Sequence, residues 1–379
     1  MSALSALKTD LNSELLTDIQ THGVRLVAPD NTHVSRRGGA GPSDHQALTM
    51  DGTTLMVPVY TQTAWQSPYV LEDNTLVKQQ PGGERIALTD ITFADTPNFY
   101  SLSTADGIPY QQIATLHSTD VLATTVLQTC IRYESRRKAC RFCSIGQSLN
   151  AGRTIAEKTP QQLAEVAKAA VELDGIKHIV MTTGTPATPD RGAKVMCDSA
   201  VAIKAEVDVP IQGQCEPPKD HSWFARMKQA GIDSLGMHLE VVTPEVRKAI
   251  TPGKAEVSLE EYMAAFAAAV EVFGRGQVST YILAGLGDSK DAILDLCQEL
   301  VGMGVYPFVV PFVPIRGTPL EDHPAPSKAF MESLLKPLAA MLVEAGITSE
   351  KSNAGCVKCG ACSPLSRYEK ELNEKEPSL

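Results

Sequence analysis

The chain has 379 residues and a formal net charge of −10, and 43% of its residues are hydrophobic. This composition excludes global disorder, and the acidic balance argues against nucleic acid or an anionic membrane as the main partner. The amphipathic N-terminus lacks the apolar run of a secretory signal, and no segment approaches the ~20 apolar residues of a membrane span. We therefore predict a cytoplasmic protein.

Residues 1–115 are predicted to form a mixed, mostly β region. A helix is expected near residues 3–22. It is followed by a Gly/Pro/Thr-rich segment with short alternating apolar runs. The clearest of these runs are "TTLMVPVYTQ" at 53–62 and "ERIALTDITF" at 84–93. Alternation of this kind is typical of half-buried strands.

Residues 116–325 change to a regular alternation of strands and helices. Six apolar, β-branched runs are visible: "DVLATTVLQT", "KHIVMTT", "VPIQGQ", "DSLGMHL", "VSTYILAG" and "VYPFVVPFV". One intervening helix has Thr159 as its cap and Gln162 to complete a capping box, and another runs from Ser258 to Gly274. Six such strands predict parallel βα units, either curled as a partial barrel or open as a doubly wound sheet.

Residues 326–379 are predicted to hold a helix near 327–345, a cysteine-rich segment and a charged tail. The tail, "YEKELNEKEPSL", is expected to fray.

A polar or Gly-rich segment follows each of the six predicted strands. In parallel βα folds the functional site forms on these loops, at the carboxyl ends of the strands. A cysteine loop follows the first strand, and the later strands are followed by "TTGT" (182–185), "QCEPP" (214–218), "HLE" (238–240), "AGLGD" (284–288) and "PIRGTPL" (314–320). Six such loops in phase favour a catalytic site at that edge.

Six of the nine cysteines fall into two tight groups. Grouping of this kind in a reducing compartment indicates metal binding and not disulfides. The first group is Cys130, Cys140 and Cys143, with nine and then two residues between its members. Three thiolates suit a soft metal or an iron–sulfur cluster. Zinc is the alternative, but structural zinc takes four ligands, and the nearest histidine, His117, lies on the far side of the strand.

The three-cysteine loop, the Gly-containing motif after the second strand and the six βα units resemble the radical S-adenosylmethionine (radical SAM) superfamily over residues 116–320. The first cysteine gap is longer than the usual C-x3-C-x2-C, but the second gap and the aromatic Phe142 before Cys143 match. "HLEVVTPEVRKAITPGKAEVSLEEYMAAF" is similar to lipoyl synthase, and "VPFVPIRGTPLED" is similar to biotin synthase and the hydrogenase-maturase-like branch. The long gap and "CVKCGACS" together resemble a radical SAM group associated with nitrilase-type gene clusters.

The resemblance implies an α/β fold: a partial (βα)6 TIM-type barrel with a mostly β N-terminal region and a Cys-rich C-terminal extension. It implies that Cys130, Cys140 and Cys143 ligate a [4Fe–4S] cluster, whose fourth iron binds the methionine end of S-adenosylmethionine (SAM). The reduced cluster would cleave SAM to a 5′-deoxyadenosyl radical. That radical would abstract hydrogen from a small metabolite or cofactor precursor.

The resemblance also implies cofactor-binding residues. Thr182, Thr183 and Gly184 stand where the family has a Gly-Gly-Glu motif that binds the methionine amino group, with Thr185 in place of the Glu. Glu240 would hold the ribose hydroxyls, and Gly285 and Gly287 would let the backbone approach the adenosine. The Phe142 backbone and apolar residues near Val313 would border the adenine, and Lys254 or Arg247 would pair with the methionine carboxylate.

The second group, Cys356, Cys359 and Cys362, has the C-x2-C-x2-C spacing that opens ferredoxin motifs. It predicts an auxiliary iron–sulfur cluster, with zinc and incidental thiols as alternatives. The fourth position could bind substrate, could belong to a sulfur-donating cluster as in lipoyl synthase, or could take Cys215 as a ligand.

Five basic residues surround the first cysteine group: Arg132, Arg136, Arg137, Lys138 and Arg141. They suit docking of an acidic electron donor such as flavodoxin or ferredoxin, and a merely solvated loop is the alternative. Two other enzyme classes stay open, a zinc-dependent lyase or hydrolase on a βα barrel and a sulfur-inserting lipoyl-synthase-like enzyme. A non-catalytic metal scaffold is the third alternative.

Overall fold

Within residues 5–6, 11–26, 45–133, 135 and 137–375, which the computed structural model describes, the strands form two seven-stranded sheets. The first sheet is mixed and has the order β2-β5-β6-β7-β3-β4, with β1 paired to β7. Its strands are β1 (Ser5–Ala6), β2 (Arg25–Leu26), β3 (His45–Met50), β4 (Thr53–Pro58), β5 (Tyr69–Glu72), β6 (Thr75–Gln79) and β7 (Arg85–Thr92). The two alternating runs of the sequence coincide with β4 and β7.

The helix expected near residues 3–22 is shorter than predicted. Helix α1 spans Ser13–His22, because the Asn12 side chain caps it by accepting from the Leu15 N–H at 2.8 Å. Residues Ser5–Ala6 instead form β1, parallel to β7, and residues 7–10 lie outside the described part. The amphipathic pattern therefore placed the helix start too early.

The second sheet has the sequential order β8 to β14, with β9 to β14 parallel and β8 antiparallel to β9. Its strands are β8 (Thr115–His117), β9 (Val121–Thr125), β10 (His178–Thr182), β11 (Ile211–Gln214), β12 (Ser234–Gly236), β13 (Val278–Ala284) and β14 (Val305–Pro311). All six predicted parallel strands form. Every residue of β9, β11 and β14 is buried, as expected for parallel strands covered on both faces, and in β11 this includes the polar Gln212 and Gln214.

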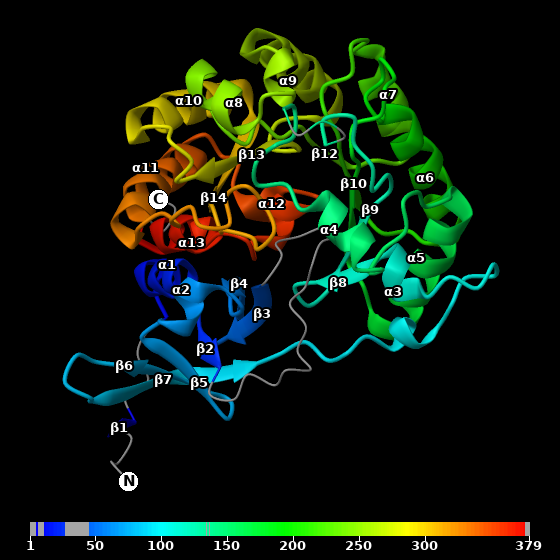
Figure 1. Cartoon of the computed structure of the whole chain (residues 1–379). Helices are drawn as coiled ribbons and strands as arrows, with labels where there is room; N and C mark the ends of the chain where they lie inside the picture. Colours follow the sequence, from blue (N-terminus) through cyan, green and yellow to red (C-terminus); the bar gives the residue numbers. More distant parts are fainter. Residues whose placement is uncertain (1–4, 7–10, 27–44, 134, 136, 376–379) are drawn as a thin grey trace.

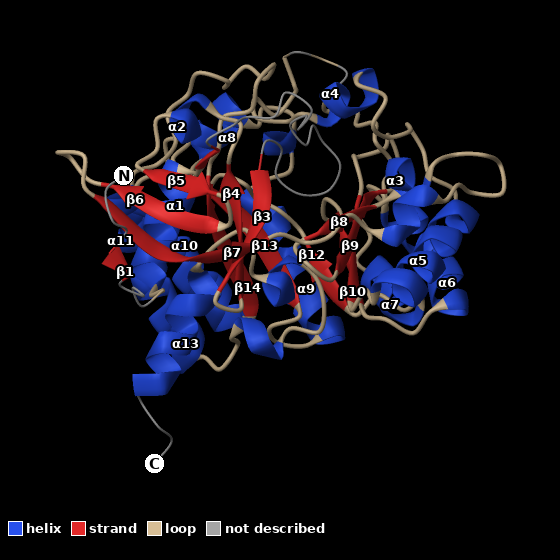
Figure 2. Ribbon diagram, turned by 90° about the horizontal axis from the view of Figure 1, so that it is seen from below, coloured by secondary structure: helices blue, strands red, loops and turns tan. Residues whose placement is uncertain are grey.

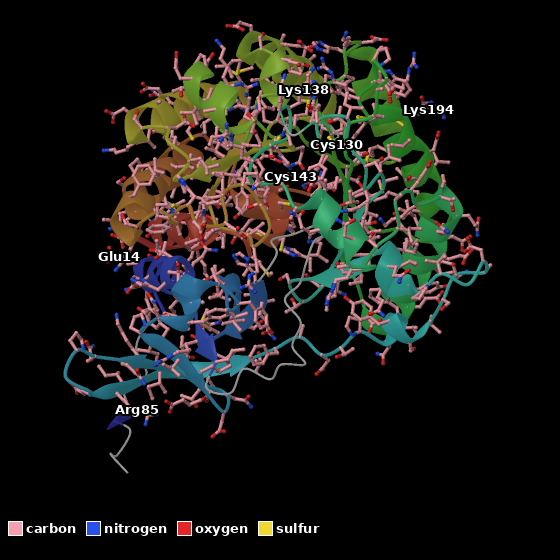
Figure 3. The ribbon with its side chains drawn as sticks, viewed as in Figure 1. Glu14, Arg85, Cys130, Lys138, Cys143 and Lys194 are labelled. Atoms are coloured by element: carbon pink, nitrogen blue, oxygen red, sulfur yellow. The ribbon has the colours of Figure 1, made fainter. Side chains whose placement is uncertain are left out.

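Helices separate the parallel strands, so the fold is α/β with a curled parallel sheet. The helices are α1, α2 (Gln62–Trp65), α3 (Tyr110–Ile113), α4 (Ile145–Asn150), α5 (Pro160–Asp174), α6 (Ala193–Glu206), α7 (Ser222–Gln229), α8 (Pro244–Ile250), α9 (Leu259–Phe273), α10 (Lys290–Met303), α11 (Lys328–Glu344), α12 (Cys356–Cys359) and α13 (Leu365–Lys375). In both views α5, α6 and α7 lie at one end of the sheet, and α10 and α11 lie at the other (Figure 1 and Figure 2). The loop after β9 carries Cys130, Lys138 and Cys143, which are labelled in Figure 3.

Capping chemistry fixes the helix ends that the sequence predicted. The Thr159 hydroxyl accepts from the Gln162 N–H at 3.2 Å, and the Gln162 side chain accepts from the Thr159 N–H at 3.0 Å. The Ser258 side chain caps α9, which ends before Gly274. The helix expected near 327–345 is α11.

The charged tail does not fray as expected. Residues from Leu365 to Lys375 form α13, in which Leu365, Tyr368 and Glu369 are buried against the main core. The Tyr306 hydroxyl donates to the Glu369 carboxylate at 2.5 Å, and Ser349 donates to its other oxygen at 2.6 Å. The prediction was wrong because it weighed the charges and not the helical spacing of Leu365, Tyr368 and Leu372.

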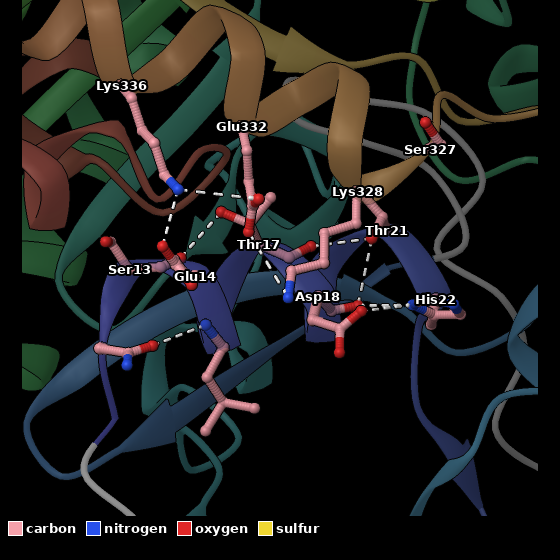
Figure 4. A network of polar contacts seen from close by, with 12 residues as sticks. Ser13, Glu14, Thr17, Asp18, Thr21, His22, Ser327, Lys328, Glu332 and Lys336 are labelled. Atoms are coloured by element: carbon pink, nitrogen blue, oxygen red, sulfur yellow. Dashed lines mark hydrogen bonds and ion pairs between the residues drawn. The ribbon is translucent and has the colours of Figure 1, made fainter.

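Helix α1 joins the first sheet to the C-terminal helices. Lys336 of α11 forms an ion pair with Glu14 at 2.7 Å, part of the polar network in Figure 4. The Ser13 hydroxyl donates to Glu371 at 2.7 Å, and Thr17 hydrogen-bonds the Tyr368 hydroxyl at 3.0 Å. In the described part of the chain no helix is long and apolar enough to cross a membrane.

Candidate active site

The three cysteines of the first group lie in the wall of one cavity at the carboxyl edge of the parallel sheet. This cysteine-loop cavity has a volume of about 290 Å³. Its wall also contains the predicted cofactor-binding residues Phe142, Thr182, Thr183, Gly184 and Glu240. The structure therefore brings together residues from the ends of three different strands, β9, β10 and β12. Burial raises the pKa of the Cys143 thiol to about 11.

The cysteine loop packs backbone to backbone on the segment that follows β10. The Ile131 N–H donates to the Thr185 carbonyl at 2.9 Å, and the Gly184 N–H donates to the Leu127 carbonyl at 2.8 Å. A Cβ atom at Gly184 would lie only 2.1 Å from the Thr129 carbonyl oxygen. Only glycine fits this close approach, which explains the one glycine of the "TTGT" motif.

Ion pairs hold the long gap between Cys130 and Cys140 in place. Arg132 donates to Glu216 at 3.1 Å and to Glu256 at 2.7 Å, and Lys138 pairs with Glu256 at 2.6 Å. These two basic residues therefore have partners within the chain. Of the other three, the Arg137 and Arg141 side chains are exposed, and Arg136 lies outside the described residues.

Glu216, which follows β11, is a buried acid in the wall of this cavity. Its side chain is 5% exposed, and it accepts from the Thr185 hydroxyl at 2.9 Å as well as from Arg132. The Glu216 carboxylate, from the loop after β11, thus contacts Thr185, where the resemblance implies an acid. The signal in the sequence was the position of Glu216 directly after a strand.

Glu240 and Lys254 form a buried ion pair in the same wall. The Lys254 Nζ lies 3.2 Å from the Glu240 carboxylate and donates to the His238 carbonyl at 2.8 Å. Burial alone lowers the pKa of Lys254, but the facing Glu240 carboxylate raises it above its ordinary value. Glu240 has φ of +70°, a conformation that is strained for a non-glycine residue and often marks a functional site.

Three residues named from the sequence lie elsewhere. Arg247 is buried outside the cavity wall, where it donates to the Val257 carbonyl at 2.7 Å and stacks on Tyr262. Gly285 and Gly287 form a turn after β13 with φ of +102° and +118°, and neither lines the cysteine-loop cavity.

A second cavity continues from the first into the concave side of the sheet. This inner cavity has a volume of about 270 Å³. Its wall shares five residues with the cysteine-loop cavity: Phe142, Thr182, Gln214, His238 and Glu240. Gln20, His45 and Met56 close it from the N-terminal part of the chain, and Cys356 and Cys362 close it from the C-terminal part.

Fixed polar side chains contact the sulfur atoms of the second cysteine group. The Gln214 side chain donates a hydrogen bond to the Cys356 sulfur at 3.1 Å. The Tyr281 hydroxyl is within hydrogen-bonding reach of Cys356 and Cys362, and the Ser118 hydroxyl is within hydrogen-bonding reach of Cys359. The His117 Nε2 lies 3.7 Å from the Cys362 sulfur. Cys215 lines the cysteine-loop cavity and not the inner one.

No three His, Cys, Asp or Glu side chains among the described residues are arranged to hold a single metal ion. In a [4Fe–4S] cluster the ligands are distributed over the irons and do not share one ion.

The family comparison covers most of the segments that line the first site. The model of the Radical SAM superfamily matches residues 136–300, which include Cys140, Cys143 and the "TTGT" motif. Residues 136–300 of this chain are thus a radical SAM domain. A radical SAM enzyme carries a [4Fe–4S] cluster, cleaves SAM, acts on a small molecule and needs a reductant.

Relatives of this radical SAM enzyme include a hydroxylase. The chain is 24% identical over 337 residues to bacteriochlorophyllide c C-7(1)-hydroxylase of Chlorobaculum limnaeum, covering 82% of this chain and 81% of the relative. Among solved structures, HydG, a maturase of the [FeFe]-hydrogenase, has 16% identity and a TM-score of 0.45 over 59% of this chain and 49% of HydG. A radical SAM methyltransferase from Sphaerobacter thermophilus has 17% identity and a TM-score of 0.45 over 74% of each chain. The chain thus spans about half the length of HydG.

Proposed function

We propose that the cysteine-loop cavity holds the [4Fe–4S] cluster and SAM, and that the inner cavity holds the substrate. The cluster would be bound by Cys130, Cys140 and Cys143. The observation that carries the proposal is the set of five residues shared by the two cavities, because a radical formed in one must reach a carbon held in the other. When bound, SAM supplies the 5′-deoxyadenosyl radical.

The fold proposed for this arrangement is a partial (βα)6 TIM-type barrel in three parts, 1–115, 116–325 and 326–379. Six consecutive parallel strands with helices between them support it, and so do the walls that the first and last parts add to the inner cavity. Walls of this kind exclude water from the radical.

Individual cofactor contacts follow from the residues in the cavity wall. Thr182, Thr183 and Gly184 would bind the methionine amino group, and Lys254 would bind the methionine carboxylate. Glu240 would bind the ribose hydroxyls, and Phe142 would border the adenine. Gly285 and Gly287 would act by shaping the turn after β13, because neither residue lines one of the two cavities.

The inner cavity favours a substrate with an apolar body and few polar groups, a small metabolite or cofactor precursor. Val180, Leu283 and Val310 are among its apolar lining residues, and no lysine or arginine of the described part lines it. His238 stays neutral there, because burial lowers its pKa to about 4. The relative's hydroxylation of bacteriochlorophyllide c supports functionalisation of an unactivated C–H bond as the reaction class.

Cys356, Cys359 and Cys362 would bind an auxiliary iron–sulfur cluster beside the substrate. A hydrogen-bond donor at each sulfur supports this, since such donors orient ligands and stabilise thiolates. Exposed Arg137 and Arg141 support docking of an acidic flavodoxin or ferredoxin in the cytoplasm.

Glu240→Gln is expected to weaken SAM binding about 10- to 100-fold, because one hydrogen bond to a charged group contributes about 1.5–3 kcal/mol. Equilibrium dialysis with labelled SAM measures this on reconstituted enzyme. The iron content should stay at the wild-type value. Glu245→Gln, at an exposed position on α8, is the matched control and should bind SAM normally. Equal affinity in the two variants would remove Glu240 from the site.

Cys359→Ala is expected to lower the iron content from about eight to about four per chain, because the auxiliary cluster loses a ligand while the first site is intact. Elemental analysis measures this after anaerobic reconstitution. The first cluster should still cleave SAM. An unchanged iron content, or zinc released in place of iron, would refute the auxiliary cluster.

A further inference from the structure

The second cysteine group offers three protein ligands, and a [4Fe–4S] cluster has four irons to bind. A fourth protein ligand would have to come from a residue that reaches the same space. The inner cavity limits the choice, because Cys356 and Cys362 both line it. Its wall contains three histidines, His45, His117 and His238.

Hydrogen bonding excludes His238 as an iron ligand. His238 Nδ1 accepts from the Tyr281 N–H at 3.2 Å, so its proton sits on Nε2 and neither ring nitrogen of the neutral ring is left to bind iron. His178, nearby on β10, is committed in the same way, because its Nδ1 accepts from the Gly355 N–H at 3.1 Å. His178 thereby positions the start of the cysteine-rich segment.

His117 is placed differently. It is the last residue of β8, its side chain is buried, and its Nε2 lies 3.7 Å from the Cys362 sulfur. The next residue, Ser118, bonds to Cys359. One short segment at the end of β8 therefore contacts two of the three cysteines.

Hydrogen bonds of the backbone hold the segment of the second cysteine group in place next to the end of β8. The Cys356 N–H donates to Gln212 at 3.1 Å, and the Met56 N–H donates to the Ala361 carbonyl at 2.7 Å. A Cβ atom at Gly355 would lie 2.1 Å from the Gln212 side chain, so the segment is seated tightly on β11. Cys362 and His117 are thus held in contact by elements that are fixed independently of each other.

We propose that His117 is the fourth protein ligand of the auxiliary [4Fe–4S] cluster held by Cys356, Cys359 and Cys362. The inference rests on the auxiliary cluster proposed above and adds its coordination. Imidazole nitrogen replaces cysteine sulfur at iron in other iron–sulfur centres. With His117 bound, no iron of this cluster is open to substrate. The bonds from Gln214, Tyr281 and Ser118 to the sulfurs then complete its surroundings.

The test isolates the auxiliary cluster by combining Cys130→Ala, Cys140→Ala and Cys143→Ala in the full chain. This background variant is reconstituted with iron and sulfide, counted for iron, reduced, and studied by pulsed electron paramagnetic resonance. We expect about four irons and a nitrogen hyperfine coupling that changes isotope pattern when histidine is labelled with ¹⁵N. The coupling should vanish when His117→Ala or His117→Cys is added.

His45→Ala in the same background is the matched control, because His45 lines the same cavity. It should keep the nitrogen coupling, because His45 is not the proposed ligand. His117→Cys should also keep about four irons, which shows that the site still forms. A coupling that survives both His117 changes, or four irons with no histidine coupling in the background, would overturn the assignment of His117. A background variant without iron would instead overturn the auxiliary cluster itself.

Discussion

Cys140→Ala is expected to bind about four fewer irons per chain than wild type and to form no detectable 5′-deoxyadenosine. Cys140 lies in the cysteine-loop cavity, and its backbone carbonyl accepts from the Cys143 N–H at 3.1 Å, so both thiolates come from one tight turn. Removing one of three ligands leaves two, which do not retain a cluster against reduction and dilution. Iron analysis and chromatography of the SAM cleavage products measure the two effects.

Cys297→Ala is the control for this substitution. Cys297 is fully buried in α10 and belongs to neither cysteine group, so the same chemical change is made away from both sites. Its iron content and SAM cleavage should equal those of wild type. Normal cleavage by Cys140→Ala, or an equal loss in Cys297→Ala, would contradict the assignment of the cysteine loop.

Gly184→Ala is expected to lower the rate of SAM cleavage at least about 100-fold while the chain stays folded, because displacements of about 1 Å at a reacting centre have effects of this size. The added Cβ would lie 2.1 Å from the Thr129 carbonyl oxygen and 3.1 Å from the Cys130 Cβ. Both neighbours belong to the cysteine loop, so the loop must move. The initial rate of 5′-deoxyadenosine formation measures the effect, with circular dichroism to verify folding.

Gly302→Ala provides the matched comparison. Gly302 lies in α10 with no atom within 4 Å of an added Cβ, so this change should be neutral or stabilise the helix by up to about 1 kcal/mol. A Gly184→Ala protein with wild-type iron content and cleavage rate would show that the loop and the "TTGT" motif do not depend on their close contact.

Much of the parallel sheet could be predicted because its signals are local. The strands from β9 to β14 lie within short segments rich in apolar and β-branched residues, and the caps at Thr159 and Ser258 lie within three residues of their partners. The positions of the cysteines, Thr182 and Glu240 at strand ends followed from the same periodicity. In α13 many charged residues surround the few apolar ones, so the helical period was overlooked and the prediction of a frayed tail was wrong.

Long-range contacts could not be predicted. Arg132 suggested a docking surface, but its partners Glu216 and Glu256 are 84 and 124 residues away in the sequence. The inner cavity likewise depends on the strand at Met56 meeting the loop at Ala361 through a backbone hydrogen bond of 2.7 Å. Backbone groups are the same at every residue, so no residue pattern indicates such a meeting.

SAM cleavage by the wild-type protein tests the central claim most directly. The protein is reconstituted anaerobically with iron and sulfide, analysed for metals, reduced with dithionite and given SAM, and 5′-deoxyadenosine and methionine are quantified. We expect about eight irons per chain and formation of both products only after reduction. Protein that holds zinc, or that holds iron and never cleaves SAM after reduction, would contradict the assignment of the cysteine-loop cavity as a radical SAM active site.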